Sequence, residues 1–308
     1  MTMDTKQIEY MLMIAEENNI TRAAQKLFIT QPALNLQLLR LEKELGTQLF
    51  HRSRTDWRPT EAGEVYLKNA RKMLQIKQET YRIIGDMVED KKGQLSVGFT
   101  PGRGSSMFSV VYPRFHSEYP EITVSPRELS VRTQQKLIAN GELDIGFMTL
   151  RDSQRTSDSY IPIADEEIFL VLPAGHPLSA HSSQMPKDGR YPTLDIAAVQ
   201  SEPFVLMYRE STIRQMVDSL FEEAGFTPNV LFETSNTSTI LTMIRSRLCC
   251  GLIPAYYLRD QPEGVACFCL PSHPTWEITA SHRKNSYLTH SASRFVELAA
   301  EYWRSERP

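Results

Sequence analysis

The sequence has few cysteines and lacks long apolar runs. Its 308 residues include four cysteines in two close pairs, Cys249 with Cys250 and Cys267 with Cys269. Ligands spaced so closely do not readily reach one tetrahedral zinc ion, and both pairs lie in apolar runs, so we interpret them as small core residues. The longest largely apolar stretch, 248–258, is far shorter than the roughly 20 residues that a membrane helix needs.

The N-terminal sequence also lacks the features of a signal peptide. Residues 1–19 alternate charged with apolar side chains, so they have neither a basic start nor an unbroken apolar core. We therefore expect the chain to be cytoplasmic and to make no contact with a membrane. A secreted solute-binding protein, which is a remote alternative, would need such a signal.

Sequence motifs of several enzyme classes are absent. The chain contains no G-x-S-x-G elbow, no G-x-x-x-x-G-K phosphate loop and no H-E-x-x-H metal motif. The glycine-rich run 102–105 is too short for a dinucleotide fingerprint, and the histidines show no metal-ligand spacing. We therefore expect no catalytic residues, no metal site and no cofactor, and an enzyme is a second remote alternative.

The chain as a whole has no positive net charge, but one segment is basic. The formal net charge is −3, which by itself argues against a nucleic-acid partner. Residues 20–58 nevertheless contain seven basic against three acidic side chains. Because contact with phosphate requires a local surplus of positive charge, this segment is a candidate for binding DNA.

Three helices are predicted within the first 46 residues. Apolar residues recur at helical spacing over 5–17, and Thr21 is a suitable cap for a short second helix. Thr30 and Pro32 are typical of the start of a third helix, which Gly46 ends. This order of a capped helix, a turn and another capped helix indicates a helix-turn-helix.

The third predicted helix has an apolar and a polar face. On a helical wheel, Leu36 and Leu39 point away from an apolar ridge made of Leu34, Leu38, Leu41 and Leu45. Gln31 and Asn35, near the N-terminal end of this helix, can reach base edges in the major groove. Residues 49–59 follow as two short strands around a basic turn, a wing suited to the phosphate backbone. We expect DNA contacts from Arg22, Thr30, Gln31, Pro32, Ala33, Asn35, Leu36, Arg40, Arg52, Arg54 and Arg58.

These residues closely resemble the LysR-type transcriptional regulators. The matching residues are TRAAQKLFITQPALN over 21–35, LEKELG over 41–46, LF over 49–50 and TEAG over 60–63. Members of that family often carry Ser where Asn35 stands, and polar or basic residues where Leu36 and Leu39 stand. The two leucines either touch thymine methyl groups or pack against the wing and read no base.

A long helix is predicted after the wing. Thr60 is a suitable cap, and the sequence stays compatible with a helix as far as Lys91. Its apolar residues follow a heptad seam, which indicates either a dimer or a helix lying on its own protein. The resemblance favours the dimer, and thus a palindromic operator, but leaves dimer and tetramer open. The expected dimer contacts are Leu67, Leu74, Tyr81, Ile84 and Val88.

The remaining residues alternate between strand and helix patterns. A βαβαβ unit is predicted over 93–148 and a second α/β unit over 168–254, which implies a parallel sheet with helices on its faces. Their order is similar to the effector-binding region of LysR-type regulators, which itself resembles periplasmic solute-binding proteins. The resemblance implies two lobes, between which we expect the chain to cross near Ala164 and Leu270.

The predicted fold class is therefore α+β overall. It combines an N-terminal winged helix-turn-helix, a long linker helix and a two-lobed α/β effector domain like a periplasmic binding protein. The expected boundaries are 1–59, 60–92 and 93–308. Within the last domain, lobe I covers about 93–164 and 270–308, and lobe II covers about 165–269.

The cleft between two such lobes is the expected effector site. Helix N-termini that face a cleft offer free N–H groups, and Arg103 and Arg209 add positive charge, so we expect a small anionic effector. The expected contacts are Thr100, Gly102, Arg103, Ser105, Ser106, Ser130, Thr133, Tyr208, Arg209, Ser211, Thr212, Asn236 and Thr237.

The sequence thus predicts a sequence-specific transcriptional regulator controlled by a small molecule. Its expected partners are double-stranded DNA, the effector and further copies of the chain, with RNA polymerase as an additional candidate. A regulator that responds to oxidation of its thiols is the alternative. Redox sensing usually needs an exposed thiolate of low pKa, whereas these cysteines lie in apolar runs, so the small molecule is favoured.

Overall fold

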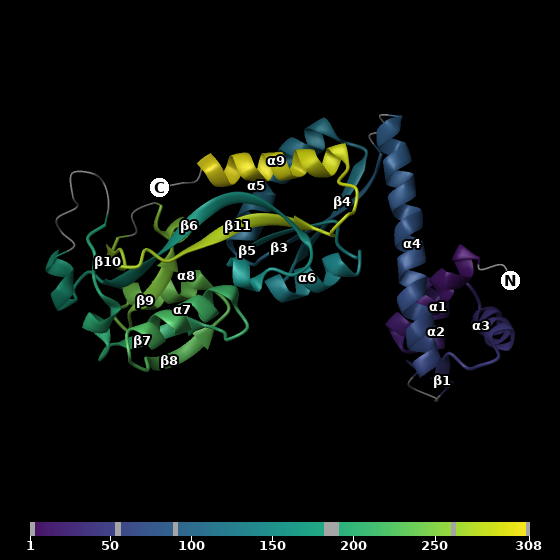
Figure 1. Ribbon diagram of the computed structural model, residues 1–308, viewed down its shortest axis with the longest axis horizontal. Helices are drawn as coiled ribbons and strands as arrows, with labels where there is room; N and C mark the ends of the chain where they lie inside the picture. Colours follow the sequence, from purple (N-terminus) through teal and green to yellow (C-terminus); the bar gives the residue numbers. More distant parts are fainter. Residues whose placement is uncertain (1–3, 53–56, 89–91, 182–190, 260–262, 306–308) are drawn as a thin grey trace. The chain divides into compact units, whose positions relative to one another are not determined.

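A computed structural model describes residues 4–52, 57–88, 92–181, 191–259 and 263–305. The chain divides into two compact units, 1–88 and 89–308, which are described separately below (Figure 1). Among the described residues, no helix is long and apolar enough to span a membrane.

The first unit contains the predicted helices and wing. All three helices pack around one core that includes Ile8, Met11, Leu34, Leu38 and Phe50. Its elements are α1 (Thr5–Glu17), α2 (Ile20–Lys26), α3 (Gln31–Leu45), β1 (Phe50–Arg52), β2 (Trp57–Pro59) and α4 (Glu61–Met87).

The helix starts in this unit follow from short polar side chains. Thr30 caps α3 by accepting a hydrogen bond from the backbone N–H of Ala33, as predicted, and Gly46 ends α3 in the left-handed region. The cap of α2 differs from the prediction. Asn19, rather than Thr21, accepts hydrogen bonds from the N–H groups of Thr21 and Arg22.

The wing is a pair of antiparallel strands. β1 pairs with β2 so that His51 lies opposite Arg58, which confirms the two predicted strands. The long helix then begins beside the wing. A Cβ atom at Gly63 would collide with the backbone carbonyl of Leu49, so glycine is needed where α4 passes the start of β1. Thr60 caps α4 through the N–H of Gly63.

α4 is shorter than predicted and only part of it is available to a partner. It ends at Met87 rather than near Lys91, which lies outside the described residues. The first half of α4 covers the core of its own unit, where Leu67 is 1% exposed. The expectation that Leu67 contacts a second copy is therefore wrong, because its own chain already buries it.

The second unit contains a mixed sheet with helices on both faces. Strands β5, β3 and β4 are parallel and adjacent, which confirms the predicted βαβαβ unit, whereas β11 runs antiparallel to β5. Helices α5 and α9 cover one face of this sheet, and α6 packs on the other (Figure 1). The elements are β3 (Gly93–Phe99), α5 (Arg103–Glu118), β4 (Ile122–Glu128), α6 (Val131–Ala139), β5 (Ile145–Leu150), β11 (Thr275–His282) and α9 (His290–Ser305).

The rest of this unit forms the second lobe, with its own cores. One core includes Phe204, Phe221 and Phe268, and a second includes Ile253 and Cys267. The elements are the C-terminal part of β6 (Ser159–Pro173), β7 (Pro203–Met207), α7 (Thr212–Glu223), β8 (Asn229–Thr234), α8 (Thr237–Arg245), β9 (Gly251–Pro254) and β10 (Val265–Phe268).

The long strand β6 belongs to both lobes. It pairs with β11 as far as Glu167, and from Ile168 onward it pairs with β9 and then also with β10. The chain returns between β10 and β11, over 269–274. We therefore place the first crossing at Glu167, three residues beyond the predicted Ala164, and the second on the segment that includes the predicted Leu270.

Candidate functional site

The polar face of α3 is accessible, as a recognition helix requires. Gln31, Pro32, Ala33 and Arg40 are exposed, and Asn35 is half-buried. On the same helix, Leu36 is 47% exposed and Leu39 is 40% exposed. The helix therefore presents polar and apolar groups together, a combination that can read both hydrogen-bonding base edges and thymine methyl groups.

The basic residues around α3 differ in how strongly they are engaged within the fold. Arg52 forms an ion pair with Glu42, a buried residue that also accepts the N–H of Leu49. Arg52 thus ties the wing to α3, which argues against the prediction that it contacts DNA. Arg22 donates to the carbonyl of Glu17 but remains largely exposed, Arg40 and Arg58 are also exposed, and Arg54 lies outside the described residues.

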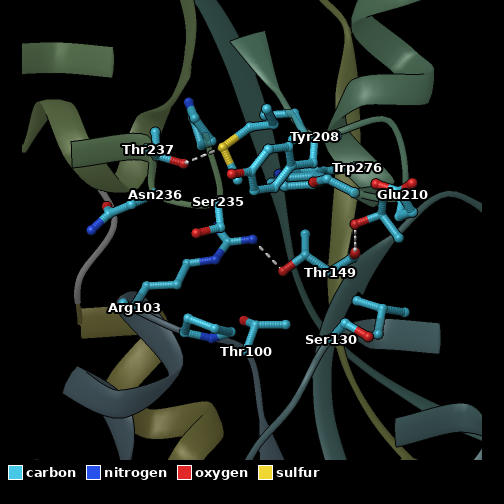
Figure 2. A pocket seen from close by; sticks show the side chains of 18 of the residues that line it. Thr100, Arg103, Ser130, Thr149, Tyr208, Glu210, Ser235, Asn236, Thr237 and Trp276 are labelled. Carbon is cyan, nitrogen blue, oxygen red and sulfur yellow. Dashed lines mark hydrogen bonds between the residues drawn. The ribbon is translucent and has the colours of Figure 1, made fainter. Parts of the chain in front are cut away.

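A cavity of about 540 Å³ lies between the lobes of the second unit. In Figure 2, Thr100, Arg103 and Ser130 lie on one side of it and Tyr208, Asn236 and Thr237 on the other. Nine of the expected effector residues line the cavity: Thr100, Gly102, Arg103, Ser130, Tyr208, Ser211, Thr212, Asn236 and Thr237.

Four helices begin at this cavity. Ser130 caps α6 and Asn236 caps α8 through side-chain oxygens. Gly102 and Ser211, at the starts of α5 and α7, make no such side-chain cap among the described residues. The N–H of Arg103 bonds to Tyr257, and the remaining first-turn N–H groups of α5 and α7 are candidates to bind an anionic group of a ligand.

Arg103 does not supply the free positive charge that the sequence suggested. Its guanidinium bonds to Thr149 (Figure 2). It is also buried, pairs with Glu166 and lies 4.8 Å from the ring centre of Trp276. Glu166 is itself fixed by the indole N–H of Trp276 at 2.7 Å and by the backbone N–H of Tyr256 at 2.9 Å. The charge of Arg103 is therefore compensated, and the residue shapes the floor of the cavity.

Four expected effector residues do not line the cavity. Ser105 donates to Glu128, Ser106 donates to the carbonyl of Gly102, and Thr133 bonds to Ser130, so these hydroxyls serve the local fold. Arg209 is 80% exposed and lies 3.8 Å from a carboxylate oxygen of Glu233. Polar residues in a loop before a helix are common, and their sequence position does not reveal which way they point.

Other residues line the cavity without having been predicted. Thr149 stands at the carboxyl end of β5, where parallel sheets commonly bind ligands, and this rule could have found it. Trp276 and Tyr257 come from late segments that carried no motif. Glu128 and Glu210 add two carboxylates at the cavity.

Hydrogen bonds connect the two lobes beside the cavity. The hydroxyl of Thr212 donates to the carbonyl of Thr149 at 2.8 Å, and Gln154 bonds to the carbonyl of Thr212 and to Gln215. A ligand that changes the spacing of the lobes must therefore change or strain these contacts.

Two family models match the chain. The model described as bacterial regulatory helix-turn-helix protein, lysR family, covers residues 5–64, and the LysR substrate binding domain covers 89–304, more than half of the chain. The chain belongs to the LysR family. It is a transcriptional regulator with a helix-turn-helix domain and a substrate-binding domain, rather than an enzyme.

Individual relatives match most of the chain. An uncharacterized HTH-type transcriptional regulator YcgK of Bacillus subtilis is 29% identical over 97% of this chain and 94% of its own length. A probable RuBisCO transcriptional regulator of Cyanidioschyzon merolae is 30% identical over 73% of this chain and 72% of its own length.

Solved structures of LysR-type proteins share the fold. A full-length OxyR variant from Pseudomonas aeruginosa has a TM-score of 0.71 at 23% identity, covering 100% of this chain and 97% of its own. Full-length CbnR in complex with its target DNA has a TM-score of 0.59 at 23% identity, covering 97% of this chain and 99% of its own.

In this LysR-family chain all four cysteines are buried. Burial raises the pKa of Cys249 and Cys267 to about 11 and that of Cys250 to about 12, because a thiolate is poorly solvated there. Burial likewise raises the pKa of Tyr191, next to Cys267, to about 12. Such thiols react slowly with oxidants, which supports their interpretation as core residues.

Proposed function

We propose that this LysR-family regulator is a cytoplasmic, sequence-specific DNA-binding protein controlled by a small molecule in the cavity between its lobes. The observation that carries the proposal is the cavity of about 540 Å³, which has the size of a small-molecule site and receives four helix N-termini. The CbnR structure that shares this fold was solved with its target DNA.

The lining favours an effector with two kinds of polar group. A carboxylate or similar anion suits the N–H groups at the starts of α5 and α7, whose N-cap residues Gly102 and Ser211 supply no side-chain cap. Glu128 and Glu210 instead favour a hydrogen-bond donor or a positive charge. A carboxylate that also carries an amino or hydroxyl group therefore matches the lining better than an anion with acceptors alone.

A dimer is the assembly that the exposed part of α4 supports. Beyond the segment that covers its own core, α4 leaves Ile76, Tyr81, Ile84, Met87 and Val88 more than half exposed. Apolar side chains exposed along one helix commonly mark an interface. Two copies joined through this segment would present two recognition helices to a palindromic operator, at a distance set by the dimer.

Thermal unfolding with candidate ligands tests the cavity as the effector site. A panel of amino acids, hydroxy acids and aromatic acids is added to the full chain, and a ligand at 100 times its dissociation constant adds about 2.7 kcal/mol to the free energy of unfolding. Ser235→Trp fills the cavity and should abolish this gain.

Ser117→Trp provides the matched control, because Ser117 is exposed near the end of α5 and does not line the cavity. It should leave the gain unchanged. A panel without any stabilising compound, or one whose effect survives Ser235→Trp, contradicts the proposed site.

A further inference from the structure

Three side chains with metal-binding atoms meet where the chain crosses between the lobes. The ligand atoms of Glu167, Cys269 and His273 all lie within 4.8 Å of one another. Nδ1 of His273 is 2.7 Å from Oε1 of Glu167, a residue 106 positions earlier in the sequence. This separation explains why the sequence showed no metal-ligand spacing.

The backbone holds these side chains in place. The N–H of Cys269 donates to the carbonyl of Pro192 at 2.9 Å, and the carbonyl of Cys269 accepts from Leu194 at 2.9 Å. His273 closes a turn on Leu270 with a φ of 44°, a left-handed conformation uncommon for residues other than glycine. The backbone that carries Cys269 and His273 is therefore held by hydrogen bonds.

We propose that Glu167, Cys269 and His273 form a binding site for a divalent ion of the zinc type. A thiolate, an imidazole and a carboxylate are the three donors that zinc takes in proteins, whereas Mg²⁺ and Ca²⁺ prefer oxygen alone. On binding, the Cys269 thiol releases its proton to solvent, and the ion replaces the hydrogen bond between His273 and Glu167.

The geometry needs only small adjustments to accept the ion. Tetrahedral zinc with ordinary bond lengths places its donor atoms roughly 3.2 to 3.6 Å apart, so the widest pair must close by about 1.5 Å. The side chain of His273 is 57% exposed and can rotate to achieve this. Three protein ligands leave one coordination position that water can fill.

The location gives the ion a mechanical role. Glu167 is the last residue of β6 that pairs with β11, and Cys269 and His273 belong to the returning segment. An ion at this position ties the two crossings of the chain together. Glu166, the residue before Glu167 on β6, holds Arg103 at the floor of the cavity. Strand β6 therefore connects the proposed ion site to the effector site.

Titration with Co²⁺ tests the site directly, because a cobalt–thiolate bond gives an intense near-ultraviolet charge-transfer band. The full chain should show this band at one equivalent of Co²⁺. Added Zn²⁺ should displace Co²⁺ and remove the band, whereas Mg²⁺ should leave the band unchanged. Cys269→Ser should abolish the band, and His273→Ala should weaken binding about tenfold or more. His273 is exposed, so its replacement avoids the risk that a core variant fails to fold.

Two matched variants separate this site from adventitious binding. Cys249→Ser removes another buried thiol, and His116→Ala removes an exposed imidazole on α5. Both should keep the band and the affinity of the unaltered chain. The proposal is overturned if the full chain gives no band, or if Cys269→Ser and His273→Ala bind Co²⁺ as well as these controls do.

Hydrogen exchange tests the mechanical role without any knowledge of the effector. Saturating Zn²⁺ should slow amide exchange over 166–168 and 269–274, and the effect should vanish in His273→Ala. Unchanged exchange at both crossings, in a chain that has bound the ion, would overturn the claim that the ion ties them together.

Discussion

At the scale of single residues, charge compensation decides which predicted site residues keep their expected role. Arg52 and Arg103 stood among the expected contacts for DNA and effector, yet each forms an ion pair with a buried glutamate, Glu42 or Glu166. A sequence shows that a charge is present but not whether a distant residue neutralises it. Arg40, which faces outward on α3, is the better candidate for a phosphate contact.

Replacement of two arginines separates stability from DNA binding. Arg52→Ala leaves the buried Glu42 without its partner, and we expect it to lower the free energy of unfolding by about 1–2 kcal/mol, a value reduced because Arg52 is partly exposed. Arg40→Ala should leave stability unchanged while reducing the slope of log affinity against log salt by about one.

Chemical denaturation and DNA binding at several salt concentrations measure these two effects. If Arg52→Ala unfolds at the same denaturant concentration as the unaltered chain, its ion pair with Glu42 does not stabilise the wing.

The buried thiols predict how stability depends on pH. Burial raises the pKa of Cys249 from its ordinary 9.0 to about 11 and that of Cys250 to about 12. The unfolded chain therefore loses these protons before the folded chain does. The stabilising contribution is complete below pH 9 and falls as the pH rises toward 11 and 12.

Denaturant unfolding between pH 8 and pH 11 measures this loss, and Cys250→Ala should make it smaller. Thiol titration at pH 8 should label the folded chain much more slowly than the unfolded chain. Rapid labelling of the folded chain would favour regulation by thiol oxidation instead.

At the scale of elements, short-range sequence signals were sufficient to predict α3, although they misplaced the cap of α2. The caps Thr30 and Gly46 and the four-residue spacing of Leu34 and Leu38 predicted α3, because each acts within one or two helical turns. The end of α4 and the mixed sheet were not predicted correctly. β11 joins β5 from a distant part of the chain, and pairing across such a separation leaves no periodic signal.

The exposed half of α4 predicts a change in oligomeric state. Ile84 is 53% exposed on the predicted seam, so Ile84→Asp would place a charge in an apolar dimer interface. Sedimentation velocity should show a shift from dimer toward monomer at low micromolar concentration. Lys72→Asp puts the same side chain at an exposed position off the seam and should leave the dimer intact.

A monomer for the unaltered chain, or an equal effect of both substitutions, would contradict the proposed dimer.

At the scale of the whole molecule, the position of the cavity was predictable but its charge was not. The order of strands and helices implied two lobes with helix N-termini between them, and nine expected residues do line the cavity. Glu128, Glu210 and Trp276 became visible only when distant segments were brought together. These residues change the expected effector from a simple anion to a molecule that also offers a hydrogen-bond donor or a positive charge.

We propose that a ligand in the cavity controls DNA binding by the helix-turn-helix. Fluorescence anisotropy tests it most directly, with a duplex selected by the full chain from random sequence and a ligand identified by thermal unfolding. The ligand should change DNA affinity by about 5- to 150-fold in the unaltered chain and in Ser117→Trp, but not in Ser235→Trp. Control of DNA binding from the cavity is contradicted if the ligand leaves the DNA affinity of the unaltered chain unchanged. It is also contradicted if the ligand changes the DNA affinity equally in all three proteins.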